Sequence, residues 1–185
     1  MEKINFENLP STNTPINANN LNQLQTNVEN EFTKKASVMT IGLSNDMTFS
    51  KANTGSTSNL ITMDKVMSSS GNKLTFDSTN HAIKIGAGVS KVKVSANAIQ
   101  SANGEGLSGI NIHKNDMSLN GAVNVGFNAI KHADQWIKLG LAPVLIDVSE
   151  GDLIKLSGYV DINTLTITIK AYNGRATNLT VEVVE

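Results

Sequence analysis

The sequence predicts an all-β protein, an antiparallel sandwich preceded by one short N-terminal α-helix. Three observations support this class. Apolar residues recur at helical spacing only near the N-terminus, short alternating segments follow from Ser37 onward, and clusters of Gly, Ser, Asn and Asp separate these segments. No alternation of strands and helices is present, so the pattern of a parallel sheet covered by helices is excluded.

Composition narrows the class of partner. A chain of 185 residues holds one ordinary domain and an appendage. A net charge of -1 provides no long-range field for nucleic acid or an anionic membrane, and no apolar run approaches the ~18 residues of a membrane span. The absence of cysteine excludes a disulfide framework and a thiolate metal site. We expect no nucleic-acid partner, no membrane insertion, no metal and no cofactor. The N-terminus lacks the basic and apolar regions of a signal peptide, so we expect no Sec export.

One helix is expected, from Pro15 to Phe32, with Asn17 as its capping residue. Its apolar stripe consists of Leu21, Leu24, Val28 and Phe32. The remaining positions are mainly Asn, Gln, Thr and Glu, which face water. The stripe either packs on the β-domain of the same chain or associates with copies of itself in a short coiled-coil bundle. We favour a trimeric stalk of this kind. At under three heptads it would be held together mainly by the heads.

Short strands are expected over the rest of the chain. They lie at residues 37–43, 47–49, 60–67, 73–76, 82–85, 90–98, 108–114, 122–130, 136–141, 153–160, 164–172 and 178–184. Alternation is clearest at residues 164–171, where apolar residues occupy every second position and Thr or Lys the others. This pattern is typical of a strand with one buried and one wet face.

Three stretches, taken in order, resemble the jelly-roll heads of the TNF/C1q superfamily. Residues 60–77 resemble the opening strand, polar turn and second strand of that fold. Residues 82–96 resemble its segment of small residues, glycine and an alternating strand, and residues 144–156 its Gly-Asp turn and following strand. The sequence departs from the C1q-like pattern at Lys91, where an aromatic residue is often found. The resemblance covers about residues 60–185 and implies an antiparallel jelly-roll sandwich.

A second resemblance lies at the N-terminus. Residues 4–22 look like the start of small tail and baseplate proteins in phages and prophages of Gram-positive bacteria, where an extended, proline-bounded segment precedes a capped helix and anchors a trimer to the tail. Both resemblances together imply a phage receptor-binding or tail-fibre protein that is made in the host cytoplasm and resides in the virion. We accordingly expect a tail-attachment segment and stalk helix over residues 1–33, a shoulder or linker with short strands over 34–59, and the jelly-roll head over 60–185.

Motifs for catalysis are scarce. The three histidines, His81, His113 and His132, are too far apart for a zinc helix. Residues 106–110 depart from a nucleophile elbow at the fifth position and precede a strand instead of a helix. We therefore expect no enzyme. The enzymatic alternative is a tail glycosidase, which needs two facing carboxylates. The candidates for such a pair are Asp134, Asp147, Glu150, Asp152 and Asp161.

A candidate ligand site lies at residues 131–136, which group charge, amide donors and the only tryptophan between two expected strands. A sugar face would stack on Trp136 while His132, Asp134 and Gln135 lie beside it, with Asp134 and Gln135 bonding its hydroxyls. The alternative is that Trp136 begins a strand and fills the core or the subunit interface. Arg175 follows an Asn-Gly turn and would meet a phosphate of a wall polymer, or simply belong to a hairpin.

The sequence as a whole predicts a homotrimer that binds other tail or baseplate proteins through its N-terminus and a host cell-wall polysaccharide or teichoic acid through its head. Three weak sites on one axis would bind tightly by effective concentration. The competing class without enzymatic activity is a structural adaptor or decoration protein that contacts only other virion proteins.

Overall fold

In the computed structural model, residues 18–35, 37–50, 59–118, 121–161, 165–172 and 175–185 are described. They form one helix and thirteen strands. The elements are α1 (Ala18–Lys35), β1 (Val38–Gly42), β2 (Met47–Ser50), β3 (Asn59–Leu60), β4 (Lys65–Ser70), β5 (Leu74–Asp77), β6 (Ala82–Ile85), β7 (Lys91–Ala102), β8 (Gly106–Lys114), β9 (Ala122–Ile130), β10 (Ile137–Asp147), β11 (Leu153–Val160), β12 (Thr166–Ile169) and β13 (Asn178–Val183). No helix within these ranges is long and apolar enough to span a membrane.

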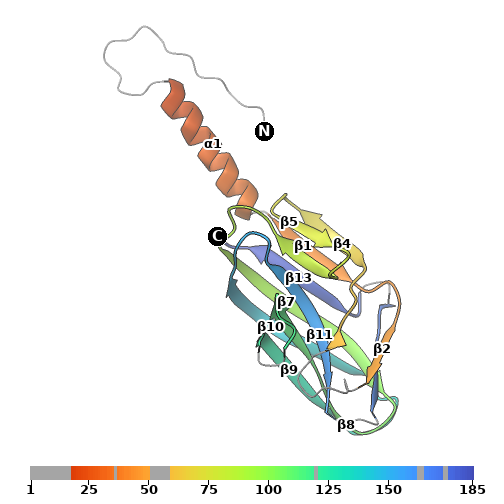
Figure 1. Cartoon of the computed structure of the whole chain (residues 1–185). Coiled ribbons are helices and arrows are strands. Elements are labelled where there is room, and N and C mark those ends of the chain that lie inside the picture. Colours follow the sequence, from red (N-terminus) through yellow and green to blue (C-terminus); the bar gives the residue numbers. More distant parts are fainter. Residues whose placement is uncertain (1–17, 36, 51–58, 119–120, 162–164, 173–174) are drawn as a thin grey trace.

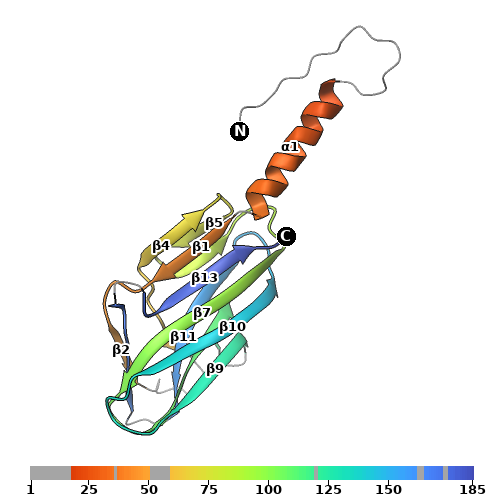
Figure 2. The same cartoon turned by 180° about the vertical axis from the view of Figure 1, so that it is seen from behind.

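The strands form two antiparallel sheets that face each other. The larger sheet has the order β2-β12-β7-β13-β1-β4, and β10 pairs with the opposite edge of β7. The smaller sheet has the order β5-β6-β11-β8-β9, with β3 also paired to β11. Figure 2 shows the larger sheet with β10 beside β7. The predicted all-β sandwich with a short N-terminal helix is therefore confirmed.

Alternating sequence produces the core between the sheets. On β7, Val92, Val94, Ala96 and Ala98 are fully or almost fully buried, while the residues between them are partly or largely exposed. The same period-2 pattern places Ile110 and Ile112 of β8 and Ile154 and Leu156 of β11 on the facing layer. Each such side chain contributes on the order of 1.5–3 kcal/mol when it leaves water. One shared core of this kind makes the two sheets a single folding unit.

The sandwich begins well before residue 60. Strand β1 pairs with both β13 and β4, and β2 pairs with β12, so both belong to the larger sheet. Met39, Ile41 and Phe49 are buried in the common core. The segment expected as a shoulder or linker thus supplies two strands of the sandwich. Its alternating residues form β1, which pairs with β13, and β2, which pairs with β12.

Several expected strands have different bounds in the structure, among them 90–98, which extends to Ala102, and 164–172, which is a strand only over Thr166–Ile169; two others differ more. The run expected at residues 60–67 is divided into β3 in the smaller sheet and β4 in the larger one, and the chain crosses between them with Ile61 and Met63 fully buried. Strand β10 continues to Asp147, beyond the expected end at residue 141. The pairing shifts register between Leu141 and Val144, which accommodates Pro143 because proline cannot donate to the ladder.

Helix α1 projects from one end of the sandwich, and the C-terminus lies beside its base (Figure 1). The predicted helix is confirmed from Ala18 to its expected end at Phe32 and continues to Lys35, whereas its expected cap, Asn17, lies outside the described residues. The helix meets the sandwich near β13. Most of its length therefore has no contact with the sandwich of its own chain.

Candidate functional site

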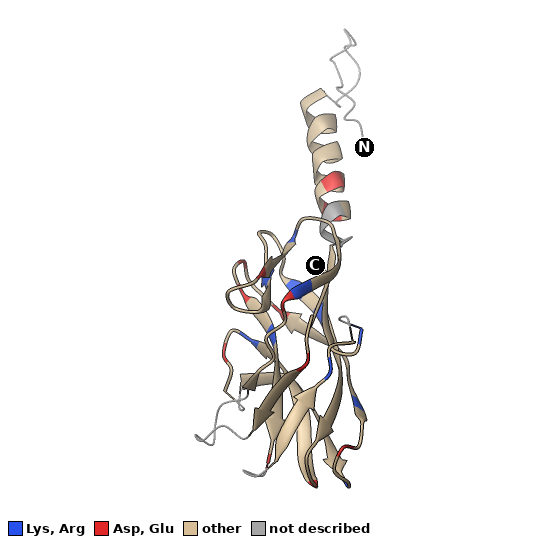
Figure 3. Ribbon diagram, turned by 90° about the vertical axis from the view of Figure 1, so that its right-hand side faces the viewer, with Lys and Arg blue, Asp and Glu red and all other residues tan. Residues whose placement is uncertain are grey.

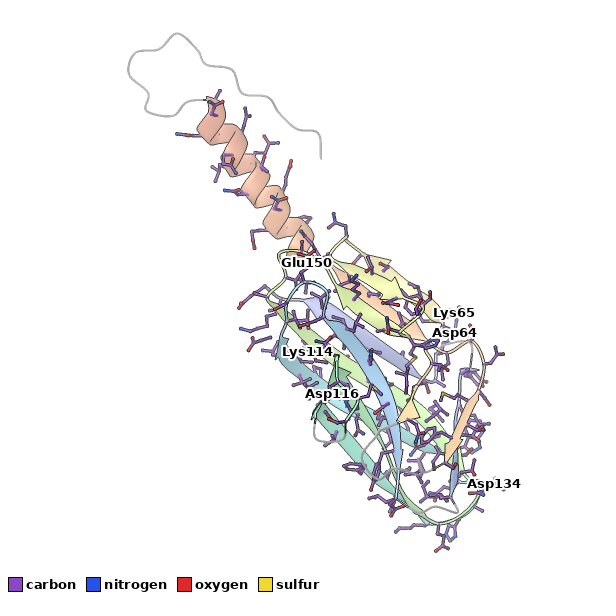
Figure 4. All side chains as sticks on the ribbon, viewed as in Figure 1. Asp64, Lys65, Lys114, Asp116, Asp134 and Glu150 are labelled. Atoms are coloured by element: carbon purple, nitrogen blue, oxygen red, sulfur yellow. The ribbon has the colours of Figure 1, made fainter. Side chains whose placement is uncertain are left out.

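The candidate ligand loop, residues 131–136, connects β9 to β10 at the end of the sandwich opposite α1. Figure 4 marks this distal end by Asp134, and Glu150 marks the end beside the helix. The loop is closed by its own hydrogen bonds. The backbone N–H of Gln135 donates to the carbonyl of His132 at 3.4 Å, and the side-chain Oε1 of Gln135 accepts from the backbone N–H of Lys131 at 3.3 Å. Asp134 has a positive φ of 59° and donates to the carbonyl of Ala102 at 2.7 Å. Asp tolerates this left-handed conformation better than most residues.

Trp136 lies on the surface. Its side chain is 59% exposed, so the interpretation of Trp136 as a core residue is wrong for the single chain. The next residue, Ile137, begins β10 and is the one that enters the core. Alternation therefore directs the indole to the outer face of the larger sheet. An exposed tryptophan is uncommon, because this side chain gains most from burial.

Lys170 joins the site across the sheet. Its Nζ lies 5.1 Å from the centroid of the Trp136 ring, within the range of a cation–π contact, and 2.9 Å from Oδ2 of Asp46. Asp46 Oδ1 accepts a hydrogen bond of 2.8 Å from the amide of Ala171. This amide, and then the Lys170 ammonium, hold the pKa of Asp46 below its ordinary value, against the raising effect of burial. The carboxylate is therefore charged at neutral pH and fixes the lysine.

Sequence reasoning missed Lys170 and Asp46. The alternating pattern of residues 164–171 places Lys170 on the wet face of the segment, which is correct, since its neighbours Ile169 and Ala171 are buried. The contact with Trp136 depends on β10 and β12 pairing with opposite edges of β7, and no short-range pattern encodes that arrangement.

Arg175 lies on the connection between β12 and β13 and is exposed. Its amide donates to the carbonyl of Tyr172 at 3.2 Å, and Tyr172 is 75% exposed with a φ of 44°. The predicted turn residues Asn173 and Gly174 lie outside the described residues. In the described part of the chain, no hydrogen bond, ion pair or ring contact joins Arg175 to residues 131–136. The structure thus brings Trp136 together with Lys170, which begins the connection between β12 and β13, and Arg175 lies five residues further along the same connection.

The candidate catalytic carboxylates are divided between two ends of the sandwich. Asp134 lies at the distal end, whereas Glu150 lies near α1 (Figure 4). Asp152 accepts hydrogen bonds from the side chain of Asn115 at 2.8 Å and the amide of Ser149 at 2.9 Å. Asp161 accepts from the amide of Leu107 at 2.9 Å. These last two carboxylates cap turns, and no hydrogen bond joins two of the five candidates in the described residues.

The histidines occupy three separate environments. His81 bonds the carbonyl of Met63 at 2.9 Å, and His132 is exposed on the candidate loop. His113 is completely buried on β8, where its Nε2 lies 2.8 Å from Oγ of Ser157. Within the ranges that the structure describes, no group of three or more His, Asp or Glu side chains has the arrangement of a metal site.

The stripe of α1 is open to solvent in the single chain. Leu24, Val28 and Phe32 are 59%, 60% and 71% exposed, and Leu21 is partly exposed. The alternative in which the stripe packs on the β-domain of the same chain is therefore wrong. A stripe of this kind is normally covered in a folded protein.

Comparison with known proteins identifies the fold. No protein family model matches the sequence, and no curated protein matches it. Two solved structures that resemble this chain are Eiger TNF from S. frugiperda and murine APRIL at pH 5.0. Eiger TNF has a TM-score of 0.57 and 7% sequence identity, over 81% of this chain and 92% of that one. Murine APRIL has a TM-score of 0.57 and 9% identity, over 81% of this chain and 100% of that one. The predicted TNF-like jelly-roll fold is therefore confirmed.

Proposed function

We propose that this chain is a non-enzymatic, trimeric phage tail or baseplate protein that attaches the virion to a host cell-surface glycan. Its N-terminal segment would bind other tail proteins, α1 would form the stalk, and the distal end of the sandwich would contact a cell-wall polysaccharide or teichoic acid. The observation that carries the proposal is the exposed Trp136, held beside polar loop residues at the end of the sandwich opposite a helix that stands apart.

The composition of α1 supports association of several copies. The helix contains five asparagines, which are weak helix formers, and no charged residue before Glu29. Figure 3 shows no charge on the part of the helix far from the sandwich, whereas basic and acidic residues are interspersed over the sandwich. Side-chain hydrogen bonds from Gln23 to Asn27 and from Gln25 to Glu29 add only about 0.2–0.5 kcal/mol each. An isolated helix of 18 residues with this content is marginal in water, so burial of its stripe between copies would stabilise it.

The distal loop supports carbohydrate as the ligand class. A ligand that stacks on an indole while bonding carboxylate and amide groups combines an apolar face with hydroxyl groups, as a sugar ring does. Asp134 and Gln135 supply such polar groups within two residues of Trp136. Contacts of this size bind weakly, and three sites on one axis would raise the avidity by ~10²–10⁴.

The experiment has two parts. Sedimentation equilibrium of the purified full chain is expected to give three times the chain mass of 19.7 kDa. Adsorption to purified Gram-positive cell walls is then compared for the wild type, Trp136→Ala, Arg175→Ala and the distant control Lys84→Ala. We expect Trp136→Ala to abolish adsorption while remaining trimeric, and the control to adsorb as the wild type does. A monomeric wild type that does not adsorb would overturn the proposal.

A second candidate function is a structural adaptor or decoration protein of the virion. The edge strand β9 favours this alternative, because Val123, Val125 and Phe127 alternate along it and are 37%, 49% and 48% exposed. Exposed apolar rows of this kind are typical of contacts with other proteins. A trimer that binds no wall fraction, and in which Trp136→Ala changes only the assembly with other virion proteins, would support the adaptor.

A further inference from the structure

Trp136 is held by a chain of contacts that runs through three separate segments. The ring lies at the start of β10, the Lys170 ammonium reaches it from the end of β12, and Asp46 approaches Lys170 from the connection between β1 and β2. The ammonium is 5.1 Å from the ring centroid and 2.9 Å from the Asp46 carboxylate.

The backbone of Lys170 is fixed on both sides. Its amide donates to the carbonyl of Ile99 at 2.8 Å, and its carbonyl accepts from Oγ1 of Thr177 at 2.8 Å. Asp46 is fixed as well, since its second oxygen accepts from the amide of Ala171. The Lys170 side chain is only 22% exposed, although a lysine on the outer face of a sheet would ordinarily extend into water. The position of the ammonium is therefore determined by the protein.

We propose that Lys170 and Asp46 are positioning residues of the Trp136 site: their ion pair covers one face of the indole and presents the other face to the ligand. A cation over one face of an aromatic ring restricts the rotation of that ring, because the contact is lost when the ring turns edge-on to the charge. The preformed orientation lowers the entropy that a sugar would otherwise lose on binding.

The ligand part of this inference rests on the proposed function, whereas the orientation of the ring does not. Lys138 provides a matched control. It lies two residues after Trp136 on the same exposed face of β10, and its register partner on β7 is Ile99, the residue whose carbonyl holds Lys170. Both lysines are thus close to the indole in the sheet, but the ring contact is made by Lys170.

Intrinsic fluorescence tests the orientation directly, because Trp136 is the only tryptophan in the chain. Emission and acrylamide quenching are measured on the full chain for the wild type, Lys170→Met, Lys170→Arg, Asp46→Asn and Lys138→Met. We expect Lys170→Met and Asp46→Asn to shift the emission to the red and to increase the quenching constant. Lys170→Arg keeps a cation at this position and is expected to retain wild-type spectra. Lys138→Met leaves the Lys170 contact in place and is expected to retain them as well. Far-UV circular dichroism and urea unfolding verify that each variant is folded.

Adsorption to purified Gram-positive cell walls tests the consequence for binding. Loss of a cation–π contact at an exposed site corresponds to about a two- to five-fold loss of affinity, expected for Lys170→Met and absent for Lys138→Met. Wild-type emission and quenching in both folded Lys170→Met and Asp46→Asn would overturn the inference. If the spectra change as expected but the wild type binds no wall, the proposed function fails and the positioning role stands. If Trp136→Ala abolishes adsorption while Lys170→Met adsorbs as the wild type does, the proposed function stands and the positioning role fails.

Discussion

At the scale of single residues, His113 shows how burial controls protonation. It lies between Ile112, which faces the core, and Lys114, and it is completely buried on the other face of the smaller sheet. Burial lowers its pKa, although the backbone and carboxylate of Asp116 oppose this, and Lys155 lowers the pKa further. The folded protein therefore holds His113 in its neutral form, bonded to Ser157.

The stability of the chain should depend on this histidine in mildly acidic solution. Because the pKa is lowered on folding, the unfolded state binds the proton first, and stability is lost as the pH falls from about 6.5 through the folded pKa. We expect the urea midpoint of the wild type to decrease from pH 7 to pH 5 and that of His113→Gln to decrease less over the same range. The exposed control His132→Gln is expected to follow the wild type. Equal pH slopes for His113→Gln and the wild type would contradict this account.

Gly158 shows a second residue-scale constraint, a close approach in the core. A Cβ atom at this position would lie 2.1 Å from Cζ of Phe49, so only glycine lets the β2 ring pack against β11. We expect Gly158→Ala to lower the free energy of unfolding by about 1–3 kcal/mol through overpacking, measured by urea unfolding. Gly104→Ala, whose Cβ would be 3.5 Å from Leu165, is the tolerant control. If the double variant Gly158→Ala/Phe49→Leu recovers part of the lost stability, the clash with Phe49 is the cause. If Gly158→Ala unfolds at the wild-type urea midpoint, there is no such clash.

At the scale of elements, α1 and the strands are stabilised in different ways. The strands are covered on one face by the opposite sheet, as in β12, where Ile167 and Ile169 are fully buried. Helix α1 has its apolar stripe in solvent in the single chain. Its stability must therefore depend on contacts outside the chain if our proposal of a trimeric stalk is correct.

The stripe can be tested within the helix. We expect Leu24→Gln/Val28→Gln to increase the dissociation constant of the trimer at least about tenfold, because each buried apolar side chain contributes roughly 1.5–3 kcal/mol. Sedimentation equilibrium gives the constant, and circular dichroism at 222 nm is expected to decrease in parallel. Asn30→Gln, off the stripe, serves as control. Unchanged association and helicity in the double variant would show that α1 takes no part in assembly.

At the scale of the whole molecule, the topology joins distant parts of the chain. Strand β1 pairs with β13, so that Val38 is opposite Glu182, and β2 pairs with β12. Such pairings require large loops to close before the core forms, which makes folding slow. The same arrangement places the end of the sandwich with α1 opposite the end with the candidate site, as a stalk and a binding tip would require.

The slow formation of these long-range strand pairings should be measurable in the refolding rate. We expect refolding of the full chain from urea, followed by Trp136 fluorescence, to take milliseconds to seconds, as in other β-sandwiches. A matched experiment on Leu24→Gln/Val28→Gln is expected to give the same rate, because the sandwich forms within one chain. Folding in microseconds would contradict the account, and a rate that depends on protein concentration would show that assembly limits folding.

The sequence by itself determined the class of fold and most element positions. Strict alternation over residues 164–171 predicted the buried row of Leu165, Ile167, Ile169 and Ala171, and steps of three and four predicted the stripe of α1, because both periodicities are local properties of the backbone. Only the tertiary structure decided that β1 and β2 belong to the larger sheet, that Trp136 is on the surface, and that Lys170 and Asp46 hold it. These contacts join residues 34 and 124 positions apart, and their formation depends on strand pairing across the whole chain, which no local pattern records.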